Sequence, residues 1–320
     1  MALTFLTPLG AAFALTALLP LAIFLVRERR ARRIRRALGL RHPSHVSRLP
    51  LVVVLAAVPT LFALAAMQPV IETTRTVHER TDAEVFVVVD ISRSMLAAAG
   101  PDAPTRLERA RLEAERLRVR FPQVPIGILS MTDRILPHLF PTTDRRVFAA
   151  TLEQAIGIER PPPVLFYSTR ATSLDSLAGI PTREYFSPSA RKRLLIVLTD
   201  GESRPLEGKL ARAFSRRSRI ETLLVHYWSA DERIYETGVA ERGYRPDRVS
   251  RDVLDRVASL VDGRVFSETE TDALEDAAVR ALGTGATRKR VIEGERRALM
   301  PYATLAVLLP LGFVLLRRNL

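Results

Sequence analysis

An apolar run that ends in a carboxylate and two hydroxyls constrains the fold of this chain more than any other feature. Residues 85–94 read Val-Phe-Val-Val-Val-Asp-Ile-Ser-Arg-Ser. An unbroken run of β-branched and aromatic residues is typical of a strand that is buried on both faces of a parallel sheet. Asp90, Ser92 and Ser94 follow at the carboxyl end of this strand, where open α/β sheets place their ligand sites.

These three side chains have the chemistry of a site for a hard divalent cation. One carboxylate and two hydroxyls offer only oxygen atoms, which suit Mg²⁺ or Mn²⁺ and are a poor set for Zn²⁺. The same residue types also favour a turn in which Asp or Ser hydrogen-bonds its own backbone. The motif by itself leaves both interpretations open.

A second strand favours the metal interpretation. Residues 194–201 read Leu-Leu-Ile-Val-Leu-Thr-Asp-Gly, so Asp200 can lie at the tip of a neighbouring strand. Between the two strands, residues 171–177 place a threonine and a serine just before a short helical pattern. The chain therefore supplies a second carboxylate and a further hydroxyl for the same site.

The order Asp-x-Ser-x-Ser, then Thr, then Thr-Asp-Gly resembles the von Willebrand factor A (VWA) domain and its metal-ion-dependent adhesion site. The resemblance implies a metal site made by Asp90, Ser92, Ser94, Thr172 and Asp200. The hydroxyls of Ser92 and Ser94 would be direct ligands, and the two carboxylates would contact the metal directly or through water. In this family the site binds partner proteins and does not catalyse.

The third hydroxyl has two candidates. Thr172 matches the loop threonine of the family, which usually follows a glycine, whereas this chain has Ala171 at that position. Thr169 is the alternative. Whichever threonine is the ligand, a carboxylate from a partner protein is expected to occupy the coordination position of the cation that this chain leaves open.

The region 81–285 alternates strand and helix patterns, which predicts a Rossmann-like, doubly wound, mostly parallel sheet of the α/β class. Thr105 begins a capping box that predicts a helix, and Pro137 indicates that residues 135–140 form an edge strand. Residues 206–218 read as a basic amphipathic helix. Two insertions, 157–170 and 229–248, either line the ligand-facing rim or are neutral additions.

Three uncharged stretches, residues 3–26, about 49–69 and 299–316, approach the roughly 20 apolar residues that cross a bilayer. The first lacks the basic start of a signal peptide, so we expect an anchor. These stretches predict two transmembrane helices in residues 1–80, joined by a basic cytoplasmic loop 27–48. Residues 286–320 are then a linker and one C-terminal transmembrane helix.

The net charge of +13 is concentrated beside these stretches. Residues 27–48 hold nine arginines and one glutamate, and residues 317–318 add two arginines, which leaves +3 for residues 70–298. This distribution argues against nucleic-acid binding. By the positive-inside rule it predicts a multi-pass protein of the cytoplasmic membrane with the VWA domain outside. The absence of cysteine excludes disulfides and cysteine-based zinc sites.

The order of segments resembles the Bat aerotolerance-type membrane proteins, which have two N-terminal spans, one VWA domain and one C-terminal span. The resemblance implies partners among other VWA membrane proteins and a MoxR-type AAA+ ATPase. We therefore expect a non-enzymatic, metal-dependent binding protein, in envelope assembly or stress response. One alternative is a metal-dependent hydrolase or phosphatase with Asp90 as nucleophile, which Ser92 disfavours because that class needs a second carboxylate there. Another is a VWA scaffold whose metal site does not function.

Overall fold

The computed structural model describes residues 2–39, 49–163, 172–214, 219–235 and 238–318. The chain divides into two compact units, one made of Met1–Thr76 with Val291–Leu320 and the other of Val77–Arg290. The predicted domain, 81–285, lies inside the second unit.

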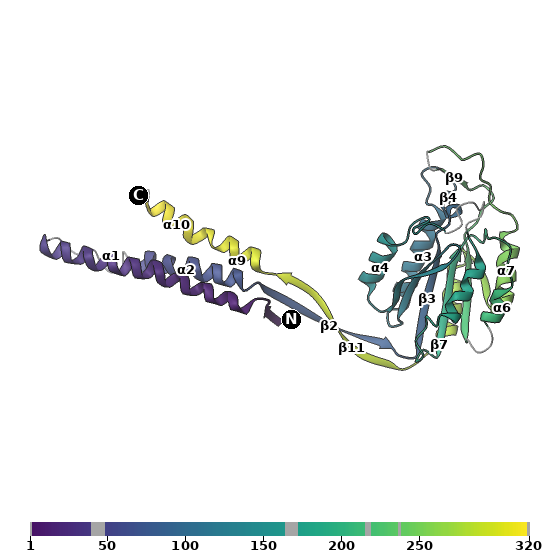
Figure 1. Ribbon diagram of the computed structural model, residues 1–320, viewed down its shortest axis with the longest axis horizontal. Helices are drawn as coiled ribbons and strands as arrows, with labels where there is room; N and C mark the ends of the chain where they lie inside the picture. Colours follow the sequence, from purple (N-terminus) through teal and green to yellow (C-terminus); the bar gives the residue numbers. More distant parts are fainter. Residues whose placement is uncertain (1, 40–48, 164–171, 215–218, 236–237, 319–320) are drawn as a thin grey trace. The chain divides into compact units, whose positions relative to one another are not determined.

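The second unit is built on a six-stranded sheet with the order β10-β8-β7-β3-β5-β6 (Figure 1). In chain order these strands are β3 (Ala83–Asp90), β5 (Ile126–Met131), β6 (Ile135–Thr142), β7 (Lys192–Thr199), β8 (Ile220–His226) and β10 (Arg264–Ser267). All neighbouring pairs are parallel except β5 and β6. The prediction of a mostly parallel sheet is therefore confirmed, and β6 lies at the edge, as its proline indicated.

Helices cover both faces of this sheet (Figure 1). One face carries α3 (Arg106–Arg120), α4 (Arg145–Gln154) and α8 (Thr271–Leu282), and the other carries η4 (Leu174–Ala178), α5 (Gly179–Thr182), α6 (Lys209–Ala213) and α7 (Ser250–Val261). Strand β3 sends Val85, Val87 and Val89 into the first core and Phe86 and Val88 into the second. Since every side chain of this run is buried, the strand needs no polar alternation.

Local signals set the start of α3. The Thr105 hydroxyl accepts a hydrogen bond from the Glu108 N–H at 3.2 Å, and the Glu108 carboxylate accepts one from the Thr105 N–H at 2.7 Å. This capping box satisfies two N–H groups that have no partner inside the helix. Of the predicted helix 206–218, the structure shows α6 (Lys209–Ala213), so the predicted start at residue 206 is wrong; residues 215–218 lie outside the described residues.

The first unit contains the apolar helices. They are η1 (Pro8–Ala17), which runs into α1 (Leu18–Ala37), then α2 (Leu49–Ala66), α9 (Met300–Ala306) and α10 (Leu308–Arg318). Within the described residues, one segment, Pro8–Ile34, is long and apolar enough to cross a membrane, with 27 residues. The apolar segments Val52–Ala66 and Met300–Phe313 are shorter. Of the three predicted spans, one therefore meets the criterion of length and composition.

Two predicted boundaries at the N-terminal side are wrong. The first span, predicted over 3–26, begins at Pro8, because Ala2–Phe5 form strand β1, which pairs antiparallel with β2 (Pro69–Arg80). The basic segment 27–48, predicted as a loop, is helical as far as Ala37. Arginine is a good helix former, so the helix continues beyond the apolar stretch.

Two predictions at the C-terminal side also need correction. The predicted linker is largely strand β11 (Thr287–Ala298), which lies next to β2 in the β1-β2-β11 sheet. The predicted span 299–316 is interrupted at Val307, between α9 and α10. Pro310 has no N–H to donate to the carbonyl of Ala306, so a regular helix is broken at this point.

Candidate metal centre

Four of the five predicted metal ligands lie at the carboxyl ends of two neighbouring central strands, β3 and β7, and the fifth, Thr172, lies just before η4. These strands are parallel, and Val89 lies opposite Leu198. From β3 the chain proceeds to β5 on one side, and from β7 to β8 on the other. The β3–β7 pair is therefore the topological switch point, where open α/β sheets form their ligand crevice.

Asp90 is fully buried and held by several hydrogen bonds. Its Oδ1 accepts from the Ser92 N–H at 2.9 Å, and its Oδ2 accepts from the Thr199 hydroxyl at 2.6 Å. The Thr172 hydroxyl lies 3.5 Å from Oδ1. The turn after β3, the end of β7 and the segment before η4 therefore meet at this one carboxylate.

The predicted hydroxyl ligands surround the same point. The Oγ atoms of Ser92, the residue before η3 (Arg93–Leu96), and of Ser94, within η3, are 3.0 Å apart. Thr172 is buried, and its carbonyl accepts a hydrogen bond from the Arg204 N–H at 2.9 Å, which holds the threonine beside Asp90. Thr169 lies outside the described residues, so the alternative candidate stays untested.

Burial of the site disfavours the ionised form of Asp90. Burial, with the nearby Asp200 as the second cause, raises the pKa of Asp90 to about 7, and hydrogen bonds from Thr199 and Ser92 only partly oppose this shift. Two carboxylates close together in a low-dielectric environment resist joint ionisation. A divalent cation between them would remove that penalty.

Asp200 is anchored on both sides. Its Oδ1 accepts from the Glu202 N–H at 2.9 Å, and its Oδ2 lies 3.0 Å from Nη1 of Arg106. The next residue, Gly201, has φ of +73°, and a Cβ there would lie 2.8 Å from the Ser250 carbonyl oxygen. The Asp-Gly pair is thus required by the backbone as well as by the site.

Sequence reasoning missed Arg106, which it placed only within a capping box. This side chain is fully buried, and its Nη1 also contacts Glu202 and Tyr244 at 3.0 Å each, while Nε donates to Glu232 at 2.7 Å. Burial opposes its charge, but Asp200 and the other acidic groups outweigh burial and raise the pKa of Arg106. Because Asp200 is 94 residues away in sequence, no local pattern indicates this pair.

Both insertions reach the turn that follows β3. In the insertion 229–248, β9 (Arg233–Ile234) pairs with β4 (Ala97–Ala98), and Glu241 forms an ion pair with Arg93 at 3.0 Å. In the insertion 157–170, the Glu159 N–H donates to the Ile91 carbonyl at 2.6 Å. The described parts of both insertions therefore lie beside the candidate metal centre.

The residues present fit a hard divalent cation. Two carboxylates and three hydroxyls provide an oxygen-only donor set, as Mg²⁺ and Mn²⁺ prefer. Within the described residues, no group of three or more His, Cys, Asp or Glu side chains is placed to hold a metal, so the candidate site depends on hydroxyls besides its two carboxylates. Metal binding itself remains a prediction.

The fold of residues 77–290 is that of a doubly wound α/β domain with its candidate site at the switch point. It is similar to the crystal structure of the conserved hypothetical protein BatB from Bacteroides thetaiotaomicron, with 21% identity and a TM-score of 0.52 over 63% of this chain and 100% of that chain. An aerotolerance-related membrane protein from Bacteroides fragilis NCTC 9343 matches with 20% identity and a TM-score of 0.51, over 62% of this chain and 98% of that chain. The VWA domain of SpRpn10 matches at 10% identity and a TM-score of 0.38, over 58% of this chain and 87% of its own.

Neither a protein-family model nor a curated protein matches this chain. The structural matches nevertheless confirm, at the level of the fold, the resemblance to Bat-type VWA proteins that the motifs predicted.

Proposed function

We propose that this chain is a membrane-anchored VWA-type protein that binds a partner protein through a divalent cation. The observation that carries the proposal is that the turn after β3, the segment before η4 and the end of β7 all meet at the side chain of Asp90. This carboxyl group is buried, and its pKa is raised by burial and by the charge of Asp200. Mg²⁺ or Mn²⁺ would lie among the oxygens of Asp90, Ser92, Ser94 and Thr172, with Asp200 as the second carboxylate.

The two carboxylates have different roles in this proposal. The three hydroxyls would contact the cation directly, and Asp90 would contact it directly or through water, because its oxygens also accept hydrogen bonds from the Ser92 N–H and the Thr199 hydroxyl. Both oxygens of Asp200 are already engaged, one by the Glu202 N–H and the other by Arg106, so it would act through a bridging water or through its charge. Since Arg106 offsets the charge of Asp200, a divalent cation keeps net positive charge for a carboxylate of the partner.

We propose binding in place of catalysis for a reason of geometry. A phosphatase of the aspartyl type needs a carboxylate oxygen that is free to attack. Here the Asp90 oxygens accept hydrogen bonds at 2.9 Å and 2.6 Å. Ser92, at the position where such an enzyme needs a second acid, instead contacts Ser94.

We also propose that the chain crosses the membrane three times. Pro8–Ile34 supports one span, and the shorter helices Val52–Ala66 and Met300–Phe313 are proposed as two more. The arginine-rich segment 27–48 would then face the cytoplasm and the VWA-type domain the opposite side. By resemblance to Bat-type proteins, partners would include other VWA membrane proteins and a MoxR-type AAA+ ATPase, in envelope assembly or stress response.

A pulldown tests the proposal. The detergent-solubilised full chain, its Asp90→Ala variant and a control, Asp255→Ala, are each used as bait in Mg²⁺ and again in chelator. Asp255 lies on α7 in an exposed pair with Arg251, so its loss removes a carboxylate away from the site. We expect partners that are captured only in Mg²⁺ and are lost only with Asp90→Ala. The proposal is contradicted if the same partners are captured in Mg²⁺ and in chelator, and equally well by the unmodified chain and by Asp90→Ala.

A further inference from the structure

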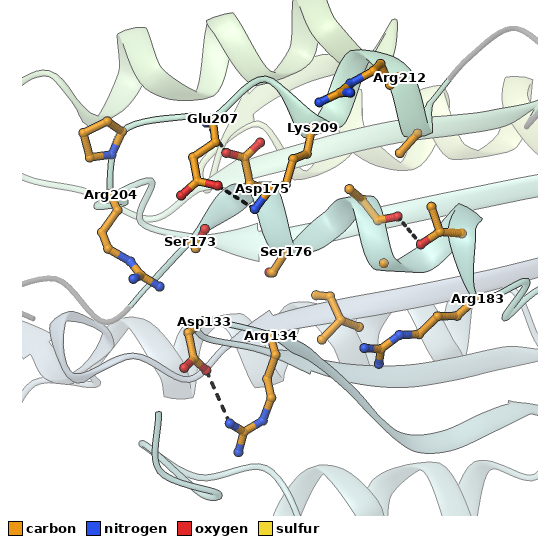
Figure 2. A pocket seen from close by; sticks show the side chains of 16 residues that line it. Asp133, Arg134, Ser173, Asp175, Ser176, Arg183, Arg204, Glu207, Lys209 and Arg212 are labelled. Atoms are coloured by element: carbon orange, nitrogen blue, oxygen red, sulfur yellow. Dashed lines mark hydrogen bonds and ion pairs between the residues drawn. The ribbon is translucent and has the colours of Figure 1, made fainter. Parts of the chain in front are cut away.

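A second cavity, of about 660 Å³, lies beside the candidate metal centre (Figure 2). It is enclosed by the beginning of β6, the η4–α5 segment, and the loop that leads into α6. Its walls include Ser173, the residue after Thr172, and Arg204, four residues after Asp200. The volume is in the range of small-ligand pockets, roughly 300–1,000 Å³.

One wall of the pocket is acidic and incompletely satisfied. Asp175 is 5% exposed, and its Oδ2 accepts a hydrogen bond from the Glu207 N–H. Its Oδ1 is buried and has no hydrogen-bond partner among the described residues. The Glu207 side chain on the same wall already pairs with the Lys209 ammonium at 2.5 Å. A buried carboxylate oxygen without a donor is costly, so it favours a ligand that brings one.

Apart from Asp133, which pairs with Arg134 at 3.7 Å, the other charged side chains of the lining are basic. Arg183, Arg204 and Arg212 come from three different segments, and within the described residues none has a carboxylate within the 4.0 Å of an ion pair. Among the residues that the structure describes, the buried Nε atom of Arg204 has no hydrogen-bond partner, and the one side-chain hydrogen bond of Arg183 is to the Tyr185 hydroxyl, at 3.4 Å. Figure 2 shows Arg204 and Arg183 at opposite ends of the pocket, with Asp175 between them.

This arrangement calls for a ligand that carries both signs of charge. A primary ammonium group would give Asp175 both the donor and the positive charge that its buried oxygen lacks. Carboxylates would meet the guanidinium groups, whose forked donors match them in geometry. A ligand with negative charge alone would leave Asp175 unsatisfied.

We propose that this pocket binds a zwitterion with a primary ammonium group and one or more carboxylates, as found in a free acidic amino acid or at the amino end of an acidic peptide. The ammonium group contacts Asp175, and the carboxylates contact Arg183 and Arg204. This activity goes beyond metal-dependent partner binding and does not need the cation. The two proposals can therefore fail separately.

Calorimetry on the full chain in detergent tests this proposal with three probes: L-glutamate, the peptide Glu-Glu-Glu with a free amino end, and the same peptide acetylated at that end. We expect the free peptide to bind about tenfold or more tightly than the acetylated one, which is the worth of one hydrogen bond to a charged group. Binding of L-glutamate identifies a free amino acid as sufficient, and binding of the peptide alone identifies a peptide end. Chelator should leave both results unchanged.

Two variants and a control locate the contacts. Arg183→Ala should weaken the free peptide about tenfold, whereas Arg145→Ala, an exposed arginine on α4 over the opposite face of the sheet, should not. Asp175→Asn should remove the preference for the free amino end, so that both peptides bind alike; a misfolded variant would bind neither. Equal binding of the two peptides to the unmodified chain, or equal weakening by Arg183→Ala and Arg145→Ala, overturns the proposal.

Discussion

The substitution Asp90→Asn should stabilise the metal-free domain while it removes the response to Mg²⁺. Asparagine has nearly the shape of aspartate but no charge, so it keeps the acceptor for the Ser92 N–H. Thr199, which now donates to Asp90 Oδ2, would have to accept from the asparagine NH₂ group. Because the two side chains have nearly the same volume, the substitution creates no cavity at this fully buried position.

The magnitude follows from the pKa of Asp90. Burial and the charge of Asp200 raise this pKa from 3.8 to about 7. A raised pKa in the folded state means that the ionisation penalty is absent below the unfolded value and complete above the folded one. At about 1.4 kcal/mol per pKa unit, ionised Asp90 lowers the free energy of unfolding by roughly 4 kcal/mol at pH 8. Allowing about 1 kcal/mol for the altered Thr199 hydrogen bond, we expect Asp90→Asn to gain roughly 3 kcal/mol.

Urea unfolding of residues 77–290, followed by the fluorescence of the single tryptophan, Trp228, measures this difference in chelator. At pH 5 most of the penalty is gone from the parent domain, so the advantage of Asp90→Asn should shrink by roughly 2–3 kcal/mol. Other buried acids titrate in both proteins, so the difference between the two reports Asp90 together with its interaction with Asp200. The stabilisation of the parent by Mg²⁺ should also decline at pH 5.

The reasoning is refuted if Asp90→Asn is less stable than the parent at pH 8 in chelator, or if the difference between them is independent of pH. If Mg²⁺ stabilises Asp90→Asn as much as it stabilises the parent, Asp90 is not a ligand. Mg²⁺ that stabilises neither protein contradicts the metal site as a whole.

Three further substitutions test other parts of the site. Arg106→Met should cost about 3–5 kcal/mol of unfolding free energy in urea, because it leaves buried carboxylates unpaired, whereas the control Arg120→Ala, in an exposed pair, should cost less than about 1 kcal/mol. Gly201→Ala should lower the melting temperature by calorimetry, since φ is +73° and the new Cβ meets a carbonyl oxygen at 2.8 Å; an unchanged value contradicts this. Ser94→Ala should weaken Mg²⁺ binding in calorimetry and leave stability in chelator nearly unchanged, because Ser94 is only partly buried.

Much of the domain was predictable because its signals are local. The apolar run of β3, the capping box at Thr105 and the proline of β6 each specify an element through a few adjacent residues. When strands and helices alternate along the chain, a parallel sheet covered by helices on both faces is one of the few arrangements that bury all their apolar surfaces. Polar residues at strand ends must then lie at one edge, which is why Asp90, Ser92, Ser94 and Asp200 could be named in advance.

The first unit, Met1–Thr76 with Val291–Leu320, was less predictable from composition. Apolar stretches indicate where helices are favoured, but helix ends depend on neighbours in space. Residues 2–5 leave the helix because β2 offers them strand hydrogen bonds. The basic segment continues the helix through Ala37 because arginine does not interrupt it.

The sequence by itself determined the α/β domain, its buried central strands and the oxygen-bearing turns at their ends, because period, capping and turn chemistry act over a few residues. Only the tertiary structure decided that Asp175 lines the neighbouring pocket with three arginines, and what surrounds those oxygens: Arg106 against Asp200, with Glu232 and Tyr244 against Arg106. These contacts join residues far apart in the chain. Their geometry depends on how the strands are ordered in the sheet, which no local pattern specifies.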